Sequence, residues 1–227
     1  MQDGVYDAFT KRLAETAGAM KVADGFEPGA VIGPLIDMKA VEKVEAHIAD
    51  ALKKGAKVVT GGKRAAQGGS FFEPTVLTDV TTDMVITKEE TFGPVAPLYR
   101  FKTEAEAIKM ANDTEFGLAS YFYSRDIGRI WRVAEALEYG IVGINEGIIS
   151  AKAIGEIVPF GGMKESGIGP IPRVTGARNT ASRNSSKSNT SAWAASTGNA
   201  SSQRAGECGF AKAVTPRAIS SSSIALC

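Results

Sequence analysis

The sequence predicts an α/β domain with a largely parallel sheet, followed by an irregular C-terminal tail. Three observations support this prediction. Apolar residues recur at helical spacing in several segments, short runs of β-forming residues alternate with those segments, and glycines close the helices. The composition then changes after Gly169, where Ser, Ala, Thr, Asn and Arg begin to dominate. We therefore expect a folded domain over residues 1–169 and an irregular tail over residues 170–227.

The first half of the predicted domain holds two helices and two extended segments. The chain is expected to open almost at once with an amphipathic helix, whose apolar residues are Val5, Phe9, Leu13, Ala17 and Met20. A second helix is predicted over residues 38–52 and ends at Gly55. A strand is predicted over residues 57–60. Residues 70–77 are rich in β-formers, and Pro74 places them at a sheet edge or a strand end.

The second half alternates strands with helices. A strand is predicted over residues 95–101, and a helix over residues 103–111, with Thr103 as its cap and Glu106 as the partner in a capping box. A strand over residues 119–123 follows. The last predicted pair is a helix over residues 126–139, closed by Gly140, and a strand over residues 141–144. Such alternation is typical of α/β layers with a parallel sheet.

Composition excludes several classes of function. Lys plus Arg number 26 and Asp plus Glu 25, so the chain has no strong field to attract nucleic acid or anionic lipid, and we expect neither nucleic acid nor a membrane as a partner. No apolar run approaches the roughly 20 residues that cross a bilayer, and the first residues lack the pattern of a signal peptide, so we expect an intracellular protein, cytoplasmic or mitochondrial. With Cys208, Cys227 and a single His47, we expect neither a metal site nor a disulfide scaffold.

Four stretches, in order, match elements of one enzyme family: I-G-P-L-I at 32–36, K-E-E-T-F-G-P-V at 88–95, N-D-T-E-F-G-L at 112–118 and P-F-G-G-M-K-E-S-G at 159–167. They resemble the G-P-x-I/V, E-x-F-G-P, N-x-T-x-Y-G-L and P-F-G-G-x-K-x-S-G elements of the aldehyde dehydrogenase superfamily. Residues 142–150 also resemble its succinate-semialdehyde branch, where the serine after the N-E-G turn helps to bind the substrate carboxylate.

This resemblance implies a partial catalytic domain of the aldehyde dehydrogenase fold over residues 1–169. The implied activity is the NAD(P)-dependent oxidation of a small-molecule aldehyde, with succinate semialdehyde, oxidised to succinate, as the expected substrate. In this chemistry a cysteine thiolate forms a thiohemiacetal with the aldehyde, and a hydride then passes to the nicotinamide. Intact members of the family are homo-oligomers. The choice between NAD and NADP stays open, because the resemblance places the residues that set it outside this chain.

Site residues follow from the matched motifs. Glu90 is expected to accept hydrogen bonds from the nicotinamide ribose hydroxyls, and Phe92 is expected to pack beside the nicotinamide. The alternative is that Glu89 and Glu90 are solvated charges before a turn and Phe92 a core residue. Ser150 and Phe160 are the expected substrate-binding residues. For Ser150, donation to a carboxylate and a simple turn position are equally compatible with the sequence.

Three further features are interpreted from the residues. Gly161 and Gly162 predict a close approach to a ligand or to another strand, with a plain loop as the alternative. Lys43 occupies a position where some relatives have a lysine near the adenine end of the cofactor, but we interpret it as a surface lysine. His47 is interpreted as a structural or solvated histidine. Residues 151–158 contain an insertion relative to the family pattern, which bears on the geometry around Ser150.

By resemblance, the catalytic residues belong upstream of Met1. The family's nucleophilic cysteine precedes the stretch that here occupies residues 2–7, and its general base lies further upstream, so we expect no catalytic residue in the chain. Cys208 and Cys227 lie in the tail, where nothing is expected to lower a thiol pKa. The alternative to an enzyme is therefore a catalytically inactive fragment or an interaction module. A nucleic-acid-binding tail is disfavoured, because its only aromatic residues are Trp193 and Phe210.

The tail carries an unusual signal of its own. Residues 178–191 can be back-translated into a nucleotide string that, read two nucleotides later, encodes K-Y-G-I-E-E-F-L-E-I-K-Y-V. Intact relatives have a segment resembling that one after the serine-glycine element, as an oligomerising strand. We therefore interpret the tail as a frame-shifted or mis-spliced reading of the family's own C-terminus, whose Ser-rich composition carries no function.

Overall fold

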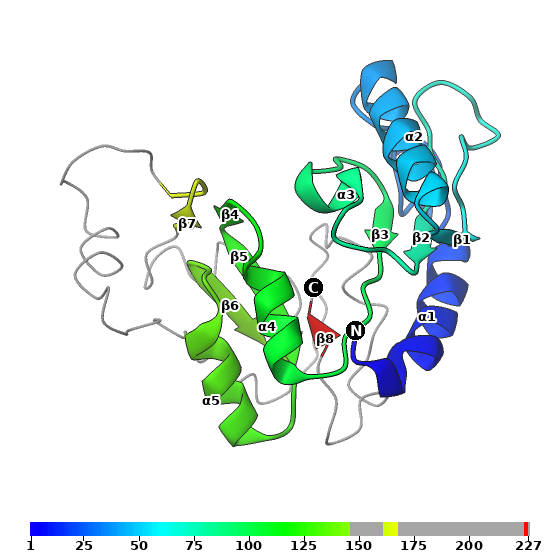
Figure 1. The fold of residues 1–227 in the computed structure, drawn as a ribbon. Coiled ribbons are helices and arrows are strands. Elements are labelled where there is room, and N and C mark those ends of the chain that lie inside the picture. Colours follow the sequence, from blue (N-terminus) through cyan, green and yellow to red (C-terminus); the bar gives the residue numbers. More distant parts are fainter. Residues whose placement is uncertain (146–160, 168–224, 227) are drawn as a thin grey trace. The chain divides into compact units, whose positions relative to one another are not determined.

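The structure of the protein is a computed structural model that describes residues 1–145, 161–167 and 225–226 of the 227-residue chain. The described residues divide into two compact units, one ending at Phe101 and the other beginning at Lys102. Among these residues, helices and strands alternate along the chain, as the sequence predicts (Figure 1).

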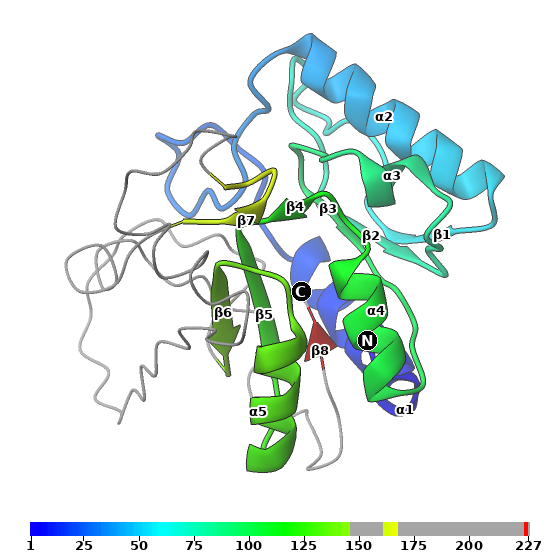
Figure 2. The ribbon, with the colours of Figure 1, turned by 60° about the vertical axis from the view of Figure 1, so that its left-hand side comes forward.

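The first unit is a three-stranded sheet with a helix on each side. Its elements are α1 (Asp3–Gly18), α2 (Met38–Lys53), β1 (Lys57–Thr60), β2 (Thr75–Thr78), α3 (Val85–Lys88) and β3 (Val95–Pro97). The strand order is β1-β2-β3, with β1 antiparallel and β3 parallel to the central strand β2. The ribbon views show α1 and α2 on opposite sides of this sheet (Figures 1 and 2). Because both of its faces are covered, β2 is buried along its whole length.

The core of the first unit lies between α2 and the sheet. The side chain of Asp37 caps α2 by accepting a hydrogen bond from the Ala40 amide at 2.8 Å, which fixes where the helix begins. The buried face of the helix then recurs at helical spacing, and Gly55, with φ of 104°, follows the last turn. The core cluster consists of Val41, Val44, Ile48, Ala51, Ala56, Phe72, Leu77, Val80, Met84 and Ile86.

Helix α1 is fastened to the segment after β3. Arg100 pairs with Asp3 at 2.6 Å and with Asp7 at 2.8 Å, and its guanidinium carbon lies 3.9 Å from the centre of the Tyr6 ring. The Asp3 amide also donates to the Phe101 carbonyl oxygen at 2.8 Å. These contacts direct the segment after β3 toward α1. The predicted strand over residues 95–101 is therefore too long, since β3 ends at Pro97.

The second unit contains helices α4 (Glu104–Asn112) and α5 (Ile127–Ala136) and strands β4 (Phe116–Gly117), β5 (Ala119–Tyr123), β6 (Ile141–Ile144), β7 (Met163–Lys164) and β8 (Ala225–Leu226). Strand β5 lies between β6, which is parallel to it, and β8, which is antiparallel. Strands β4 and β7 form a separate antiparallel pair. Along β5, buried and half-buried residues alternate, as expected for successive side chains on opposite faces.

Side chains mark both ends of the helices in this unit. Thr103 accepts from the Glu106 amide at 3.2 Å, and the Glu106 carboxylate accepts from the Lys102 amide at 2.8 Å, so both residues of the predicted capping box bind at the start of α4. The predicted helix over residues 126–139 is too long. It ends at Ala136, because the Asn112 side chain donates to the Ala136 carbonyl oxygen at 2.8 Å and closes that end.

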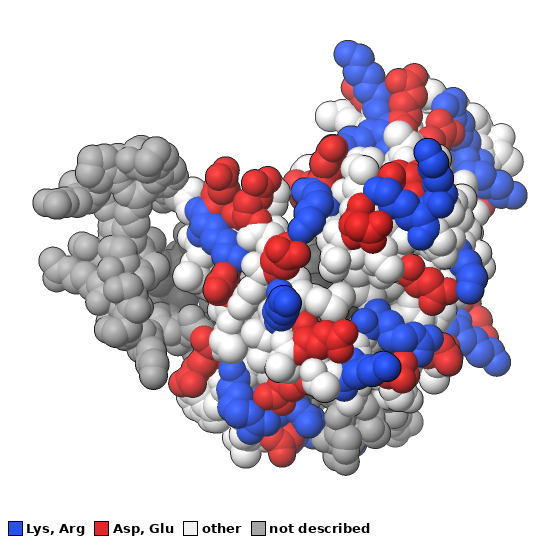
Figure 3. Space-filling view, viewed as in Figure 1, with Lys and Arg blue, Asp and Glu red and all other residues white. Residues whose placement is uncertain are grey.

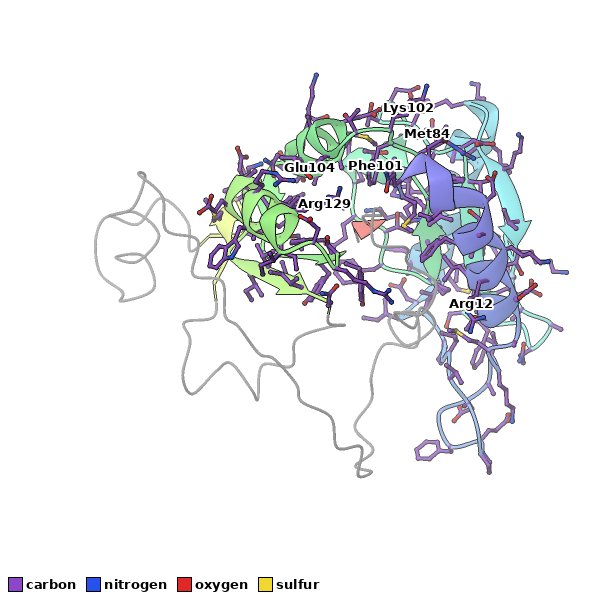
Figure 4. All side chains as sticks on the ribbon, turned by 90° about the horizontal axis from the view of Figure 1, so that it is seen from below. Arg12, Met84, Phe101, Lys102, Glu104 and Arg129 are labelled. Carbon is purple, nitrogen blue, oxygen red and sulfur yellow. The ribbon has the colours of Figure 1, made fainter. Side chains whose placement is uncertain are left out.

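Glu104 joins the two helices of the second unit. Its carboxylate lies 2.9 Å from Arg132 Nε and 3.1 Å from Arg129 Nε (Figure 4). These hydrogen bonds hold the pKa of the Glu104 carboxyl below its ordinary value, and the bond from Arg132 has the largest effect. Elsewhere charge is mixed: on the face shown in Figure 3, basic and acidic side chains of the described residues are interspersed.

The predicted α/β class is confirmed, with parallel pairs β2–β3 and β5–β6 alongside the antiparallel pairs. The sequence did not predict α3, β4, β7 or β8. In the expected irregular tail, Ala225–Leu226 form a strand, whereas the other tail residues lie outside the described part of the chain. Among the described helices, none is long and apolar enough to span a bilayer.

Candidate functional site

The loop between α3 and β3 carries the two expected cofactor-binding residues. Helix α3 ends at Lys88, and Glu89 takes an extended conformation, with φ of −108° and ψ of 133°. The chain then runs directly into β3 at Val95. Glu90 is exposed, and Phe92 retains 75% of its surface. The alternative of Phe92 as a core residue is therefore wrong.

Helix α2 anchors this loop through a buried histidine. His47 is only 4% exposed, and its Nδ1 lies 2.6 Å from the hydroxyl oxygen of Thr91. Its Nε2 lies 3.6 Å from a carboxylate oxygen of Glu89. Lys43, one helical turn earlier on α2, places its ammonium nitrogen 3.6 Å from the same oxygen. Two residues of the loop are thus held by one face of one helix.

Gly93 brings the loop backbone into close contact with α2. A Cβ atom at Gly93 would lie 2.5 Å from Val44 Cγ2 and 3.6 Å from Leu35 Cδ2, and the first distance is too short for any real contact. Val44 is buried in the core and cannot move aside without disturbing it. Glycine is required here by the close approach of the backbone.

Residues that contact α2 and residues that are exposed lie side by side in the loop. Glu89, Thr91 and Gly93 contact α2, although Glu89 is also exposed, and Glu90 and Phe92 are exposed as well. Glu90 makes no hydrogen bond or ion pair with any residue that the structure describes. A carboxylate with free acceptor oxygens thus stands one residue from an exposed aromatic ring, which fits a ligand that has both hydroxyls and an apolar ring.

The expected substrate-binding residues fall elsewhere in the chain. Ser150 and Phe160 lie outside the described residues, so their position relative to Glu90 and Phe92 stays a prediction. Among the described residues, no group of three or more His, Cys, Asp or Glu side chains could hold a metal ion. That the loop of residues 89–94 binds the cofactor likewise stays a prediction, and the structure shows which residues of α2 contact this loop.

Met1 is a packing residue. The resemblance places the nucleophile and the general base upstream of it. Met1 is only 6% exposed, and its amino group donates a hydrogen bond to the Tyr99 carbonyl oxygen. Its own carbonyl oxygen accepts from the Phe101 amide at 3.0 Å. Met1 thus holds the start of the chain against the segment after β3, and we assign it no part in the site. That the catalytic residues lie upstream of Met1 stays a prediction.

Two of the matched motifs meet in the second unit. Strands β4 and β7 pair the segment at 112–118 with the segment at 161–167. Lys164 donates to the carbonyl oxygens of Asn112 at 2.7 Å and Thr114 at 2.9 Å, and its ammonium nitrogen lies 2.7 Å from a carboxylate oxygen of Glu138. These contacts give Lys164 a structural role.

Glycine packing explains the next part of the same motif. A Cβ atom at Gly140 would lie 1.9 Å from the Gly161 carbonyl oxygen, so the two backbones can approach only because Gly140 has no side chain. A Cβ atom at Gly162 would similarly lie 2.6 Å from Ser166 Cβ. The close approach expected of the glycine pair is thus made by Gly162 to Ser166 of its own motif, whereas at Gly161 it is the partner, Gly140, that must lack a side chain.

Sequence reasoning missed the roles of His47 and Lys43. His47 is a structural histidine, as one of the two interpretations had it, but its partner Thr91 lies 44 residues along the chain and left no local signal. Lys43 is a half-exposed surface lysine, as interpreted, and it forms a surface ion pair with the exposed Glu89. The available signal was their four-residue spacing, which places both on one face of α2.

Comparison with known proteins identifies relatives. Residues 1–185 match the model of the aldehyde dehydrogenase family. The chain is 61% identical, over 169 residues, to the succinate-semialdehyde dehydrogenase (NADP+) of Escherichia coli K12 and to a glutarate-semialdehyde dehydrogenase of Pseudomonas aeruginosa. Each match covers 74% of this chain and 34% of the relative, so the chain spans about a third of the length of these curated relatives.

Solved structures give the same result. The crystal structure of a succinate-semialdehyde dehydrogenase from Burkholderia pseudomallei is 63% identical, with a TM-score of 0.70, over 74% of this chain and 34% of that one. An NAD+ complex of an aldehyde dehydrogenase from Bacillus cereus is 39% identical, with a TM-score of 0.69, over 74% of this chain and 33% of that one.

Proposed function

This chain belongs to the aldehyde dehydrogenase family, and on that premise we propose that its residues 89–94 hold the nicotinamide end of NAD or NADP. The observation that carries the proposal is the exposure of Glu90 and Phe92, while Thr91 between them and Glu89 beside them contact α2. The Bacillus cereus relative, whose structure contains NAD+, supports a dinucleotide as the ligand.

Each residue of the loop has a separate task in this proposal. Glu90 accepts hydrogen bonds from the two ribose hydroxyls, because an ionised carboxylate offers two strong acceptor oxygens and no donor. Phe92 packs against the nicotinamide and keeps water from one side of it. The bound nucleotide supplies the hydride acceptor for aldehyde oxidation. The residues that contact α2, which are Glu89, Thr91 and Gly93, keep Glu90 and Phe92 in place.

The proposed substrate is a short aldehyde with an anionic group at its far end, succinate semialdehyde in the first instance. Three kinds of relative support this class, since the succinate-semialdehyde, glutarate-semialdehyde and 3-sulfolactaldehyde enzymes are between 57% and 61% identical to the chain. In the proposal, Ser150 donates its hydroxyl to the anionic group and Phe160 lines the same site. Both residues are assigned by their resemblance to the family motifs.

For the 227-residue chain by itself, we propose a second and narrower role, that of a catalytically inactive fragment. Its only cysteines are Cys208 and Cys227, and neither lies in a motif that the family uses for its nucleophile. Aldehyde oxidation of this type requires a thiolate to form the thiohemiacetal. The chain, mixed with succinate semialdehyde and NAD or NADP, should therefore form no reduced nucleotide above the rate without protein.

A chimera tests the function of the family domain. The 169 matched residues of this chain would replace the corresponding residues of the Escherichia coli relative, to which they are 61% identical. We expect the chimera to oxidise succinate semialdehyde with NADP+, and Glu90→Gln in the chimera to raise KM for NADP+. A folded chimera that binds NADP+ but does not oxidise the aldehyde, or a Glu90→Gln variant with unchanged KM, would overturn the assignment.

A further inference from the structure

We propose that His47 is the positioning residue of the cofactor-binding loop, and that it acts through Thr91. This inference rests on the function proposed above, because it gives a reason for the loop to be held in one conformation. It concerns a residue of α2 that, among the described residues, makes no hydrogen bond or ion pair with Glu90 or Phe92. His47 determines where they point.

The contact between His47 and Thr91 is short and lies largely inside the protein. The distance of 2.6 Å between His47 Nδ1 and Thr91 Oγ1 joins a ring that is only 4% exposed to a half-buried hydroxyl. A buried polar group without a partner costs free energy, so each residue stabilises the other's position. Either atom can be the donor, depending on the tautomer of the imidazole. A leucine of similar size would fill the space but would lose this bond.

Thr91 lies between Glu90 and Phe92 in the chain. Because the three residues are consecutive, holding Thr91 in place limits how far both of its neighbours can move. The same imidazole also approaches Glu89, at 3.6 Å from Nε2. The His47 ring thus contacts both Thr91 and Glu89, which are two positions apart in the loop. A displaced ring would release Thr91 and would leave Glu89 with Lys43 and its backbone bond to Val85.

Backbone hydrogen bonds already fix the two ends of the loop. The Glu89 amide donates to the Val85 carbonyl oxygen at 2.9 Å, which continues the turn of α3. The Pro94 carbonyl oxygen accepts from the Thr75 amide at 2.7 Å, which ties the far end to β2. Between these two backbone bonds, the side-chain contacts with α2 hold the segment. His47 provides the shortest polar contact among them.

The test uses the complete 227-residue chain with substitutions on both sides of the bond. His47→Leu and Thr91→Val each remove the hydrogen bond and keep the volume, whereas Thr91→Ser keeps the hydroxyl. Lys39→Ala, at an exposed position of the same helix, is the control. Two quantities are measured: amide hydrogen exchange of residues 89–93, and the affinity for nicotinamide mononucleotide, which carries the nicotinamide and ribose without the adenine.

We expect His47→Leu and Thr91→Val each to speed exchange in the loop by roughly 2- to 10-fold, the range that corresponds to one hydrogen bond. The double variant should exchange no faster than either single one, because both remove the same interaction. The mononucleotide affinity should fall in all three, by at most the same factor, since only the fraction of loops in the competent conformation binds. Thr91→Ser and Lys39→Ala should behave as the unsubstituted chain.

Unchanged exchange in both single variants would overturn the inference, as would additive effects in the double variant. Faster exchange throughout α2 in His47→Leu, with no such change in Thr91→Val, would show a packing role alone and would also overturn it. A different result would overturn the proposed function. If the unsubstituted chain does not bind the mononucleotide, the function is wrong, and the exchange data still decide whether His47 positions the loop.

Discussion

Lys164 donates a hydrogen bond to the carbonyl oxygen of Asn112 at 2.7 Å, across 52 positions of sequence. Asn112 is the last residue of α4, where backbone carbonyls lack partners within the helix and a cation is favourable. The same ammonium group reaches the Thr114 carbonyl oxygen and the Glu138 carboxylate. A lysine in a motif that suggested a ligand site therefore closes a helix.

Lys164→Met is expected to destabilise the second unit by about 1.5 to 3 kcal/mol, the usual range for hydrogen bonds to a charged group. The substitution keeps the aliphatic part of the side chain and removes its ammonium group. Lys109→Met, at an exposed position of α4, is the control and should change stability little. Urea unfolding followed by circular dichroism measures the difference. Equal stability of the two variants would show that Lys164 has no such role.

Gly140→Ala is expected to be the more damaging of two matched glycine substitutions. Its new Cβ would lie 1.9 Å from the Gly161 carbonyl oxygen, and we expect a loss of about 2 kcal/mol or more, because backbone must move. Gly128→Ala, in α5, meets the flexible end of Arg132 at 3.3 Å and the Asp126 carboxylate at 3.5 Å, and should raise stability by up to about 1 kcal/mol. Thermal unfolding of both variants checks this. A tolerated Gly140→Ala would disprove the close approach.

Glu104→Gln is expected to lower stability in a pH-dependent way. The pKa of Glu104 is depressed in the folded chain, so its stabilising effect is present above the ordinary value of about 4.3 and is lost as the pH falls through the depressed pKa. At pH 7 we expect a loss of about 1 kcal/mol, because the hydrogen bonds from Arg129 and Arg132 would then go to a neutral amide and no longer to a carboxylate. Unfolding midpoints at pH 7 and pH 3 measure it, with Glu135→Gln as the control. A difference that stays constant between the two pH values would exclude this linkage.

The nucleotide sequence tests the origin of the tail. If the tail is a frame-shifted or mis-spliced reading, the codons for residues 178–191, read two nucleotides later, encode a segment resembling K-Y-G-I-E-E-F-L-E-I-K-Y-V. Sequencing the gene and its transcript across this region gives the result directly. A shifted frame that contains stop codons or an unrelated sequence would refute the interpretation.

Elements with strong local patterns were predictable from the sequence. The strands at 57–60 and 119–123 have the predicted bounds, because β-forming runs between turns determined them locally. The ends of α5 and β3 were wrong, since Asn112 closes one and contacts with α1 redirect the chain after the other. Such partners are distant in sequence and leave no local pattern.

In the candidate site, too, local patterns were predictable and contacts between distant residues were not. Glu90 and Phe92 could be identified, because one short motif contains both of them. Their anchoring could not, because His47 and Thr91 lie in different elements and meet only when α2 packs beside the loop. Ser150 and Phe160 remain predictions from resemblance.

The most direct measurement of the central claim is a titration of the 227-residue chain with nicotinamide mononucleotide, followed by NMR. We predict saturable shifts at Glu90, Phe92 and their neighbours, and an affinity roughly 10-fold weaker in Glu90→Gln, because a charged acceptor is lost. Glu42→Gln, at an exposed position of α2, should bind as the unsubstituted chain does. Shifts confined to other parts of the chain, or equal affinity in the Glu90→Gln and Glu42→Gln variants, would contradict the account.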